Sequence, residues 1–270
     1  MTPRTSEAVG TPVVFIHGLW LHADSWGVWV DRFREFGYAP ITVGWPGEGA
    51  NVEETRRNAE RVAGYGLDEI VRNHIAVIAD LDTKPIVVGH SFGGLIAQRL
   101  LADGYAIAGV AIDPAPIKGV FVLPPSELRV ASVALRNPRN RGRAVALSRE
   151  QFRYGFGNQL TRSESDELFD RWAIPSPGKP LFEAAFANLS KHSPAEVDTE
   201  AHRGPLLLTA GLKDHTVPPS TVRATSKRYR RSPAVTNFIE FPGRGHTLAL
   251  DTGWPDVAES VLAWLKDRSL

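Results

Sequence analysis

Short apolar runs rich in valine and isoleucine recur along the chain and alternate with helical patterns. Several of these runs are apolar throughout, whereas a strand with one solvated face would alternate apolar and polar residues. The runs cover residues 12–16, 40–43, 85–88, 107–112, 205–208 and 236–241. Strands that alternate with helices and are buried on both faces form parallel sheets with right-handed crossovers. The sequence therefore predicts an α/β fold with a mostly parallel six-stranded sheet flanked by helices.

The stretch 114–203 breaks this alternation. We find no convincing strand in it, and it contains three helix-start signals instead: Pro125-Ser126, Ser148 with Gln151 three residues later, and Ser163 with Asp166 three residues later. A stretch of this length is too long for a loop inside a compact domain. We therefore expect a helical cap inserted between the fourth and fifth strands. The predicted core domain comprises residues 1–113 and 204–270, and the predicted cap subdomain comprises residues 114–203.

A G-x-S-x-G pentapeptide follows the third predicted strand, with Gly89, Ser91 and Gly93 at its fixed positions. An apolar strand leads into it and a helix rich in small residues leads out. A serine on so sharp a strand-to-helix turn needs neighbours without bulk two residues before and two after it. This context predicts a nucleophile elbow with Ser91 exposed at its tip.

The first predicted strand ends in His17-Gly18-Leu19-Trp20. Acyl transfer places negative charge on a carbonyl oxygen, and preorganised backbone amides stabilise that charge. We predict that the amides of Leu19 and Phe92 form such an oxyanion hole. His17 is interpreted as a structural support for this loop rather than as a base.

Together these segments resemble the α/β-hydrolase superfamily, and in particular its serine-triad, esterase- or lipase-like members with an inserted helical cap. The resemblance covers about residues 11–268 and implies a triad in the chain order serine, acid, histidine. The turn that holds Asp214, before Val217-Pro218, resembles the acid turn of this family. The turn before His246, Pro242-Gly243-Arg244-Gly245, resembles its histidine turn. Asp113, at the end of the fourth strand, stands where some members carry the acid and is the alternative.

The position of the histidines favours the same base. Of the eight histidines, only His215 and His246 follow Asp214, and His215 is its immediate neighbour in the chain. The chain departs from the family pattern in three respects, one of which is that Leu19 follows His17-Gly18, so that no side chain there can bind halide. Two antiparallel strands that commonly precede the first parallel strand are not evident, and Gly44 stands where an aspartate is common in the turn after the second strand.

These residues predict a carboxylic ester hydrolase that works through an acyl-enzyme on Ser91. His246 would act as the general base and Asp214 would orient its imidazole. Four alternatives remain open: a lactonase, a carbon–carbon hydrolase, a perhydrolase, or a ligand-sensing receptor on a hydrolase scaffold. We expect no cofactor and no metal, because the sequence has no phosphate-binding G-x-x-x-x-G-K-[ST], no HExxH and no CxxC.

The overall charge is nearly balanced, with 31 basic and 30 acidic residues. This balance favours a small-molecule substrate over nucleic acid or a membrane surface as the partner. The sequence contains no cysteine, and its first residues do not resemble a signal peptide. We expect a cytoplasmic monomer or homodimer.

Candidate pocket residues flank the predicted site and the cap. They are Trp20, His22, Phe152, Tyr154, Phe156 and Phe186, and for each of them ordinary packing is the alternative interpretation. An apolar lining of this kind favours an apolar ester of small to medium size. The cap also carries seven arginines between Arg129 and Arg153. They form either a solvated face or a docking patch for an anionic group.

Overall fold

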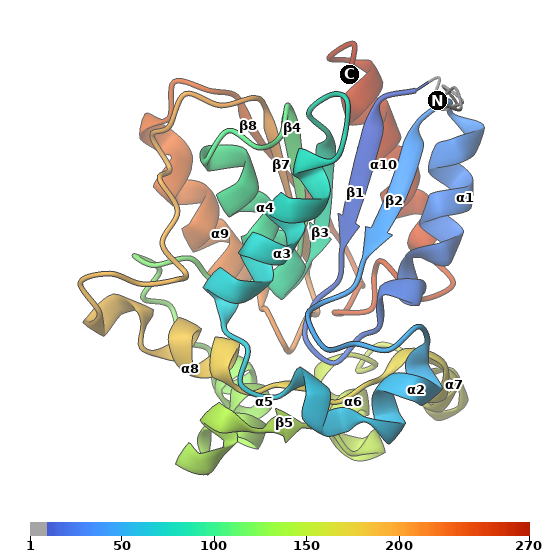
Figure 1. Ribbon diagram of the computed structural model, residues 1–270, viewed down its shortest axis with the longest axis vertical. Coiled ribbons are helices and arrows are strands. Elements are labelled where there is room, and N and C mark those ends of the chain that lie inside the picture. Colours follow the sequence, from blue (N-terminus) through green and yellow to red (C-terminus); the bar gives the residue numbers. More distant parts are fainter. Residues whose placement is uncertain (1–9) are drawn as a thin grey trace, which may run out of the picture.

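The computed structural model describes residues 10–270 and contains the predicted sheet. Its six strands run in the order β2-β1-β3-β4-β7-β8, and every neighbouring pair is parallel. The strands are β1 (Pro12–Ile16), β2 (Ala39–Val43), β3 (Ile86–His90), β4 (Ala108–Ile112), β7 (Leu206–Gly211) and β8 (Thr236–Phe241). The predicted fold class is confirmed, and the carboxyl ends of the strands meet at one edge of the sheet (Figure 1).

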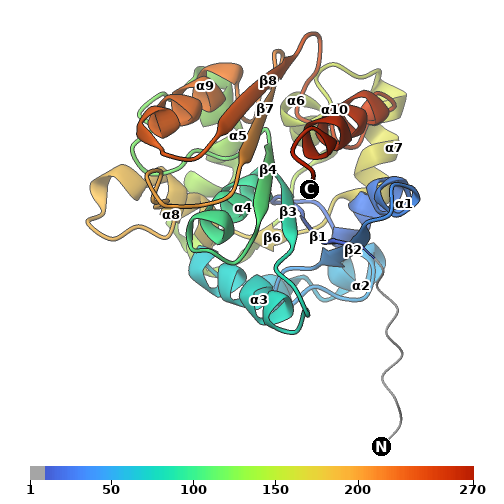
Figure 2. The ribbon, with the colours of Figure 1, turned by 90° about the horizontal axis from the view of Figure 1, so that it is seen from above.

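Helices cover both faces of this sheet, as the view from above shows (Figure 2). Helices α1 (Gly27–Glu35) and α10 (Trp254–Lys266) lie on one face, and α3 (Leu67–Ala79), α4 (Phe92–Ala102) and α9 (Pro219–Arg228) lie on the other. Alternate strand residues point to opposite faces. Val13 and Phe15 accordingly pack with α1 and α10, whereas Val14 and Ile16 pack with the opposite helices. This two-sided burial explains the continuous apolar runs in the sequence.

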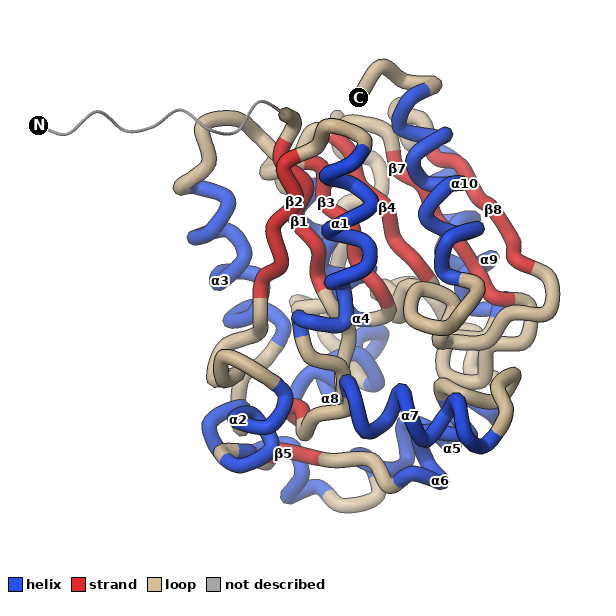
Figure 3. The backbone as a smooth tube through the Cα atoms, turned by 90° about the vertical axis from the view of Figure 1, so that its right-hand side faces the viewer, coloured by secondary structure: helices blue, strands red, loops and turns tan. Residues whose placement is uncertain are grey.

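The segment between β4 and β7 lies across the carboxyl ends of the strands (Figures 1 and 3). Its elements are α5 (Pro125–Leu135), β5 (Ala144–Val145), α6 (Arg149–Gly155), α7 (Arg162–Trp172), β6 (Ser176–Pro177) and α8 (Lys179–Ala185). Helix α2 (Val52–Arg57) lies beside them, and the Arg56 guanidinium donates hydrogen bonds of 2.8 Å to the carbonyls of Ala173 and Phe169. Residues 10–270 also contain the short 3₁₀ helices η1 (Ala23–Trp26), η2 (Ala59–Val62), η3 (Pro138–Gly142), η4 (Ala187–Leu189) and η5 (Tyr229–Arg231).

Two details of this segment differ from the sequence-based expectation. Strands β5 and β6 pair antiparallel within a stretch expected to hold no strand. Each has two residues, too few to leave a periodic pattern, and Trp20 bridges them. Its indole donates to the carbonyl of Val145 at 3.0 Å and its amide to the Ser176 hydroxyl at 2.6 Å.

The second difference is the start of α7. The capping box there is formed by Thr161 and Glu164, whereas the sequence favoured Ser163 and Asp166. The Thr161 hydroxyl accepts from the Glu164 amide, and the Glu164 carboxylate accepts from the Thr161 amide. The other two helix-start signals are confirmed: α5 begins at Pro125, and Ser148 with Gln151 forms the capping box of α6. Within residues 10–270 no helix is both long and apolar enough to cross a membrane.

Candidate active site

Ser91 lies on a sharp turn between β3 and α4, with φ 56° and ψ −121°. Such a backbone conformation is costly for a residue with a Cβ and persists where the surrounding structure enforces it. The two glycines of the pentapeptide allow it. A Cβ at Gly89 would overlap the carbonyl oxygen of Gly93, and a Cβ at Gly93 would overlap that of Ile16. The turn therefore has the geometry of a nucleophile elbow.

His246 and Asp214 meet in the loops that follow β8 and β7. Nδ1 of His246 lies 2.6 Å from Oδ2 of Asp214, and both side chains are fully buried. The other carboxylate oxygen of Asp214 accepts hydrogen bonds from the amides of Thr216 at 2.6 Å and Val217 at 2.9 Å. Nε2 of His246 is buried and has no hydrogen-bond partner among residues 10–270. The imidazole is thus oriented by one nitrogen and left free to exchange a proton at the other.

Asp113 is the third buried group of this cluster. Its Oδ2 lies 4.0 Å from Nδ1 of His246, beyond hydrogen-bond distance, while its Oδ1 accepts from the Gly211 amide at 2.7 Å. The Gly211 amide stands at the end of β7, where the turn to Asp214 begins. Asp214 therefore makes the direct contact with His246. Asp113 stabilises the turn that carries Asp214 through its hydrogen bond with the Gly211 amide.

The two carboxyl groups differ in the contacts that act on their pKa values. Burial, followed by the charge of Asp214, raises the pKa of Asp113 well above its ordinary value. Burial also raises the pKa of Asp214, but the hydrogen bonds from the Val217 and Thr216 amides act in the opposite direction. The amides of Thr216 and Val217 thus stabilise the charged form of Asp214, whereas the charge of Asp214 disfavours ionisation of Asp113.

Burial lowers the pKa of His246 to about 3. The imidazole is consequently neutral at pH 7, which is the form that can accept a proton. Two aromatic rings hold it in place. The His90 ring lies 4.5 Å away between centroids and the Phe156 ring lies 4.8 Å away, edge on. Nε2 of His90 also lies 2.9 Å from the carbonyl oxygen of His246, so the residue before Ser91 contacts the histidine loop directly.

Sequence reasoning missed His90 and also Arg244. His90 occupies a variable position of the pentapeptide and therefore carried no signal. The Arg244 guanidinium donates to the carbonyls of Leu248 and Gly253 and pairs with Asp251. These bonds fix the loop that carries His246.

The metal-binding potential of this cluster is limited by its hydrogen bonds. One ligand atom each from His90, Asp113 and His246 lies within 4.8 Å of the others. Nδ1 of His246 already bonds Asp214, and Nε2 of His90 already contacts a backbone carbonyl. A metal ion would have to bind through the remaining ring nitrogens. The existing bonds fit a proton-transfer site better than a metal centre.

The loop predicted to supply the oxyanion hole passes beside Ser91. A Cβ at Gly18 would lie 2.7 Å from the Cβ of Ser91, which brings the chain at Gly18 and Leu19 against the serine. Phe92 is the first residue of α4, and the first amides of a helix have no partner within it. Leu19, Phe92 and Ser91 line one cavity. This placement fits the predicted donors.

A carboxylate that sequence reasoning missed supports this loop. Oε1 of Glu48 lies 3.1 Å from Nε2 of His17, whose Nδ1 lies 2.9 Å from the carbonyl oxygen of Gly18. Burial lowers the pKa of His17, but the charge and hydrogen bond of Glu48 outweigh it and the net direction is upward. A Cβ at Gly44 would lie 2.9 Å from Oε2 of Glu48. Glu48 thus fills the space beside Gly44, where the family commonly has an aspartate, and His17 is a support for the loop.

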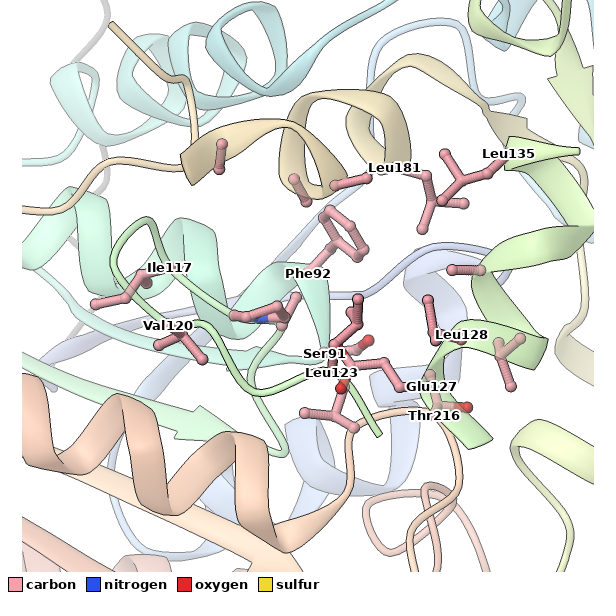
Figure 4. Close-up of a pocket in the computed structure, with 18 of the residues that line it drawn as sticks. Ser91, Phe92, Ile117, Val120, Leu123, Glu127, Leu128, Leu135, Leu181 and Thr216 are labelled. Atoms are coloured by element: carbon pink, nitrogen blue, oxygen red, sulfur yellow. The ribbon is translucent and has the colours of Figure 1, made fainter. Parts of the chain in front are cut away.

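A cavity of about 370 Å³ opens at Ser91 (Figure 4). Trp20 lines it, in agreement with the sequence-based expectation, but the other five candidate pocket residues are placed elsewhere. They pack as follows: Phe152 and Phe156 stack on each other in the core, Tyr154 lies against His215 and Arg129, His22 caps η1, and Phe186 is exposed. The walls come instead from smaller side chains of α5, α8 and the loop before α5. Which face a helix turns inward depends on packing that the sequence does not display.

The cap arginines do not line this cavity. Arg149 pairs with Asp170, and Arg153 lies 3.1 Å from Asp166. The Arg129 guanidinium lies 3.8 Å from the centre of the Tyr154 ring. These contacts favour the interpretation of the cluster as a partly paired, solvated surface.

Comparison with known proteins agrees with this architecture. Residues 13–260 match the model of the alpha/beta hydrolase family. The chain therefore belongs to the alpha/beta hydrolase family, and this membership supports a hydrolase.

Several solved structures share the fold. A monoacylglycerol lipase from Paleococcus ferrophilus is 21% identical with a TM-score of 0.69, and 95% of each chain is covered. An extracellular alpha/beta-hydrolase from a Paenibacillus species is 19% identical with a TM-score of 0.68, over 94% of this chain and 98% of the other. A methylesterase from Arabidopsis is 14% identical with a TM-score of 0.66, over 95% and 99%.

Sequence similarity to a characterised relative is local. A non-heme chloroperoxidase from Burkholderia pyrrocinia is 33% identical over 125 residues. The match spans 45% of this chain and 40% of the relative.

Proposed function

We propose that this protein is a serine hydrolase that cleaves carboxylic esters, with Ser91, His246 and Asp214 as its triad. The observation that carries the proposal is the 2.6 Å contact between Nδ1 of His246 and Asp214, behind a nucleophile elbow that opens on an apolar cavity. Its other support is the contact of His90, the neighbour of Ser91, with His246.

The proposed reaction has two halves. His246 Nε2 takes the proton of the Ser91 hydroxyl as its oxygen attacks the ester carbonyl, and Asp214 stabilises the imidazolium. The amides of Leu19 and Phe92 stabilise the oxyanion. The imidazolium then protonates the leaving alcohol, and an acyl-enzyme on Ser91 remains. Water, deprotonated by His246, attacks the acyl group, which releases the acid and restores Ser91.

The 114–203 segment is proposed to act as the cap that shapes the substrate. It contributes most of the cavity walls, and these are largely apolar. Such a cavity suits an apolar ester of small to medium size. The boundaries of the cap at residues 114 and 203 remain a prediction.

A second candidate is perhydrolysis on the same acyl-enzyme. The local similarity to a protein named as a non-heme chloroperoxidase favours it over the lactonase, carbon–carbon hydrolase and receptor alternatives. Hydrogen peroxide would replace water as the acyl acceptor, so that the products are the peracid and free Ser91. Turnover of one ester with and without peroxide, with titration of peracid, separates the two reactions.

The test of the main proposal is Ser91→Ala. We expect ester hydrolysis and labelling by a fluorophosphonate probe to be abolished, because the alanine has no nucleophile, while the fold is retained. Ser260→Ala on α10 is the matched control and should keep both signals. Stoichiometric probe labelling of the Ser91→Ala protein would show that Ser91 is not the nucleophile.

A further inference from the structure

The cavity beside Ser91 contains one carboxyl group. Glu127 lies on α5 and lines the cavity, as Figure 4 shows. Within residues 10–270 it is the only ionisable side chain of the lining, and most of the others are alanine, valine, leucine and isoleucine. An isolated carboxylate in apolar surroundings is costly, so its presence there calls for a partner.

The protein itself supplies one partner to Glu127. The Thr221 hydroxyl donates to its Oε2 at 2.7 Å, and the described residues place no cation beside the carboxylate. Its Oε1 has no hydrogen-bond donor among these residues and is not sealed from solvent. Burial raises the pKa of Glu127 to about 7. Apart from Ser91, the other polar side chains of the lining already bond backbone groups: Trp20, Asn188 and Thr216.

We propose that Glu127 is a specificity-determining residue that accepts a hydrogen bond from a hydroxyl or ammonium group on an otherwise apolar ester. This inference rests on the proposed function. A substrate without such a donor would leave Oε1 unpaired when it displaces water from the cavity, and unpaired buried acceptors are strongly disfavoured. At pH 8, above the pKa of about 7, Glu127 is mostly ionised, and a substrate with a carboxylate at the same place would meet like charge.

The experiment uses four matched esters that differ at one position: hydrogen, hydroxyl, ammonium or carboxylate. One series carries the group on the acyl chain and another carries it on the alcohol. We expect kcat/KM of the wild type to be about ten-fold higher for the better donor-bearing ester than for the plain one, which is the gain of one hydrogen bond. The carboxylate ester should be the poorest substrate.

Two variants of Glu127 test whether this residue causes the preference and whether the preferred substrate group is a hydroxyl or an ammonium. Glu127→Leu should abolish the preference, because the plain ester no longer leaves an acceptor unpaired and its kcat/KM rises, while the donor-bearing ester loses its hydrogen bond. Glu127→Gln should keep the preference for hydroxyl, because the amide oxygen still accepts, and lose that for ammonium. Glu167→Gln, an exposed glutamate on α7, is the matched control. A preference that persists in Glu127→Leu, or a wild type that favours the plain ester in both series, would overturn the inference.

A binding measurement separates failure of this inference from failure of the proposed function. Calorimetry on the Ser91→Ala protein measures affinity for the same esters without turnover. Hydrolysis of the plain ester by the wild type tests the function alone. Equal affinities for plain and donor-bearing esters would overturn the role of Glu127 whether or not the wild type hydrolyses any of them.

Discussion

The two sides of the cavity are built by different means. On the core side, Asp214, His246 and Asp113 are fully buried and joined by hydrogen bonds to one another or to backbone amides. On the cap side, the walls are apolar, and several side chains at the rim are exposed, with Phe121 at 79% and Leu189 at 83%. The proposed chemistry accordingly depends on fixed polar geometry, whereas the proposed selection of the substrate depends on the shape of the cavity and on Glu127.

The largest expected effect is on the core side. Asp214→Asn should lower kcat by about 10³- to 10⁴-fold, because the amide cannot accept the Nδ1 proton of His246 with the same charge and favours the wrong tautomer. Asp113→Asn should lower kcat less than ten-fold, since the amide oxygen can still accept from the Gly211 amide and Asp113 makes no direct contact with His246. Steady-state kinetics of both variants measure the two losses in kcat. A larger loss in Asp113→Asn than in Asp214→Asn would assign the acid role to Asp113.

A smaller loss of activity is expected from substitution of Glu48, which contacts His17 behind the predicted oxyanion loop. Glu48→Ala should lower kcat by about 10- to 100-fold with little change in KM, because the loop amide acts mainly on the transition state. Glu48→Gln should recover part of the loss by keeping a hydrogen bond to His17. If kcat stayed at the wild-type level while only the melting temperature fell, Glu48 would be a purely structural residue.

On the cap side, a change of shape should alter selectivity and leave the chemistry intact. Ala184→Phe on α8 narrows the cavity and should lower kcat/KM for medium-chain esters about ten-fold, while an acetyl ester stays within two-fold of wild type. Phe186→Ala is the matched control, because Phe186 does not line the cavity. A uniform loss over all chain lengths would mean that α8 also supports the catalytic residues.

The smallest effect concerns stability and pH. The pKa of Glu127 is raised from 4.5 to about 7 in the folded protein, so folding favours the protonated carboxyl. The stabilisation of the folded state by the protonated Glu127 is complete below pH 4.5 and is lost as pH rises through about 7. Glu127→Gln should therefore stabilise the protein at pH 8 by roughly 2 kcal/mol and have little effect at pH 4. Chemical denaturation at both pH values measures this, and a pH-independent difference would contradict it.

The sequence by itself determined the parallel sheet, the nucleophile elbow and the two loops that carry Asp214 and His246. These features are local. A buried strand requires a run of apolar residues, and the turn at Ser91 requires glycine two residues before and after it, so each leaves its mark within a few positions of the chain.

Only the tertiary structure decided which side chains meet. Asp214 lies 2.6 Å and Asp113 4.0 Å from the same nitrogen of His246, although both follow parallel strands that end at one edge of the sheet. Glu48 fills the space beside Gly44, and Glu127 lines the cavity, whereas five of the six pocket residues that the sequence favoured lie elsewhere. The physical reason is the same in each case. These contacts join residues far apart in the chain, and they depend on the rotation and tilt of packed elements, which no local pattern encodes.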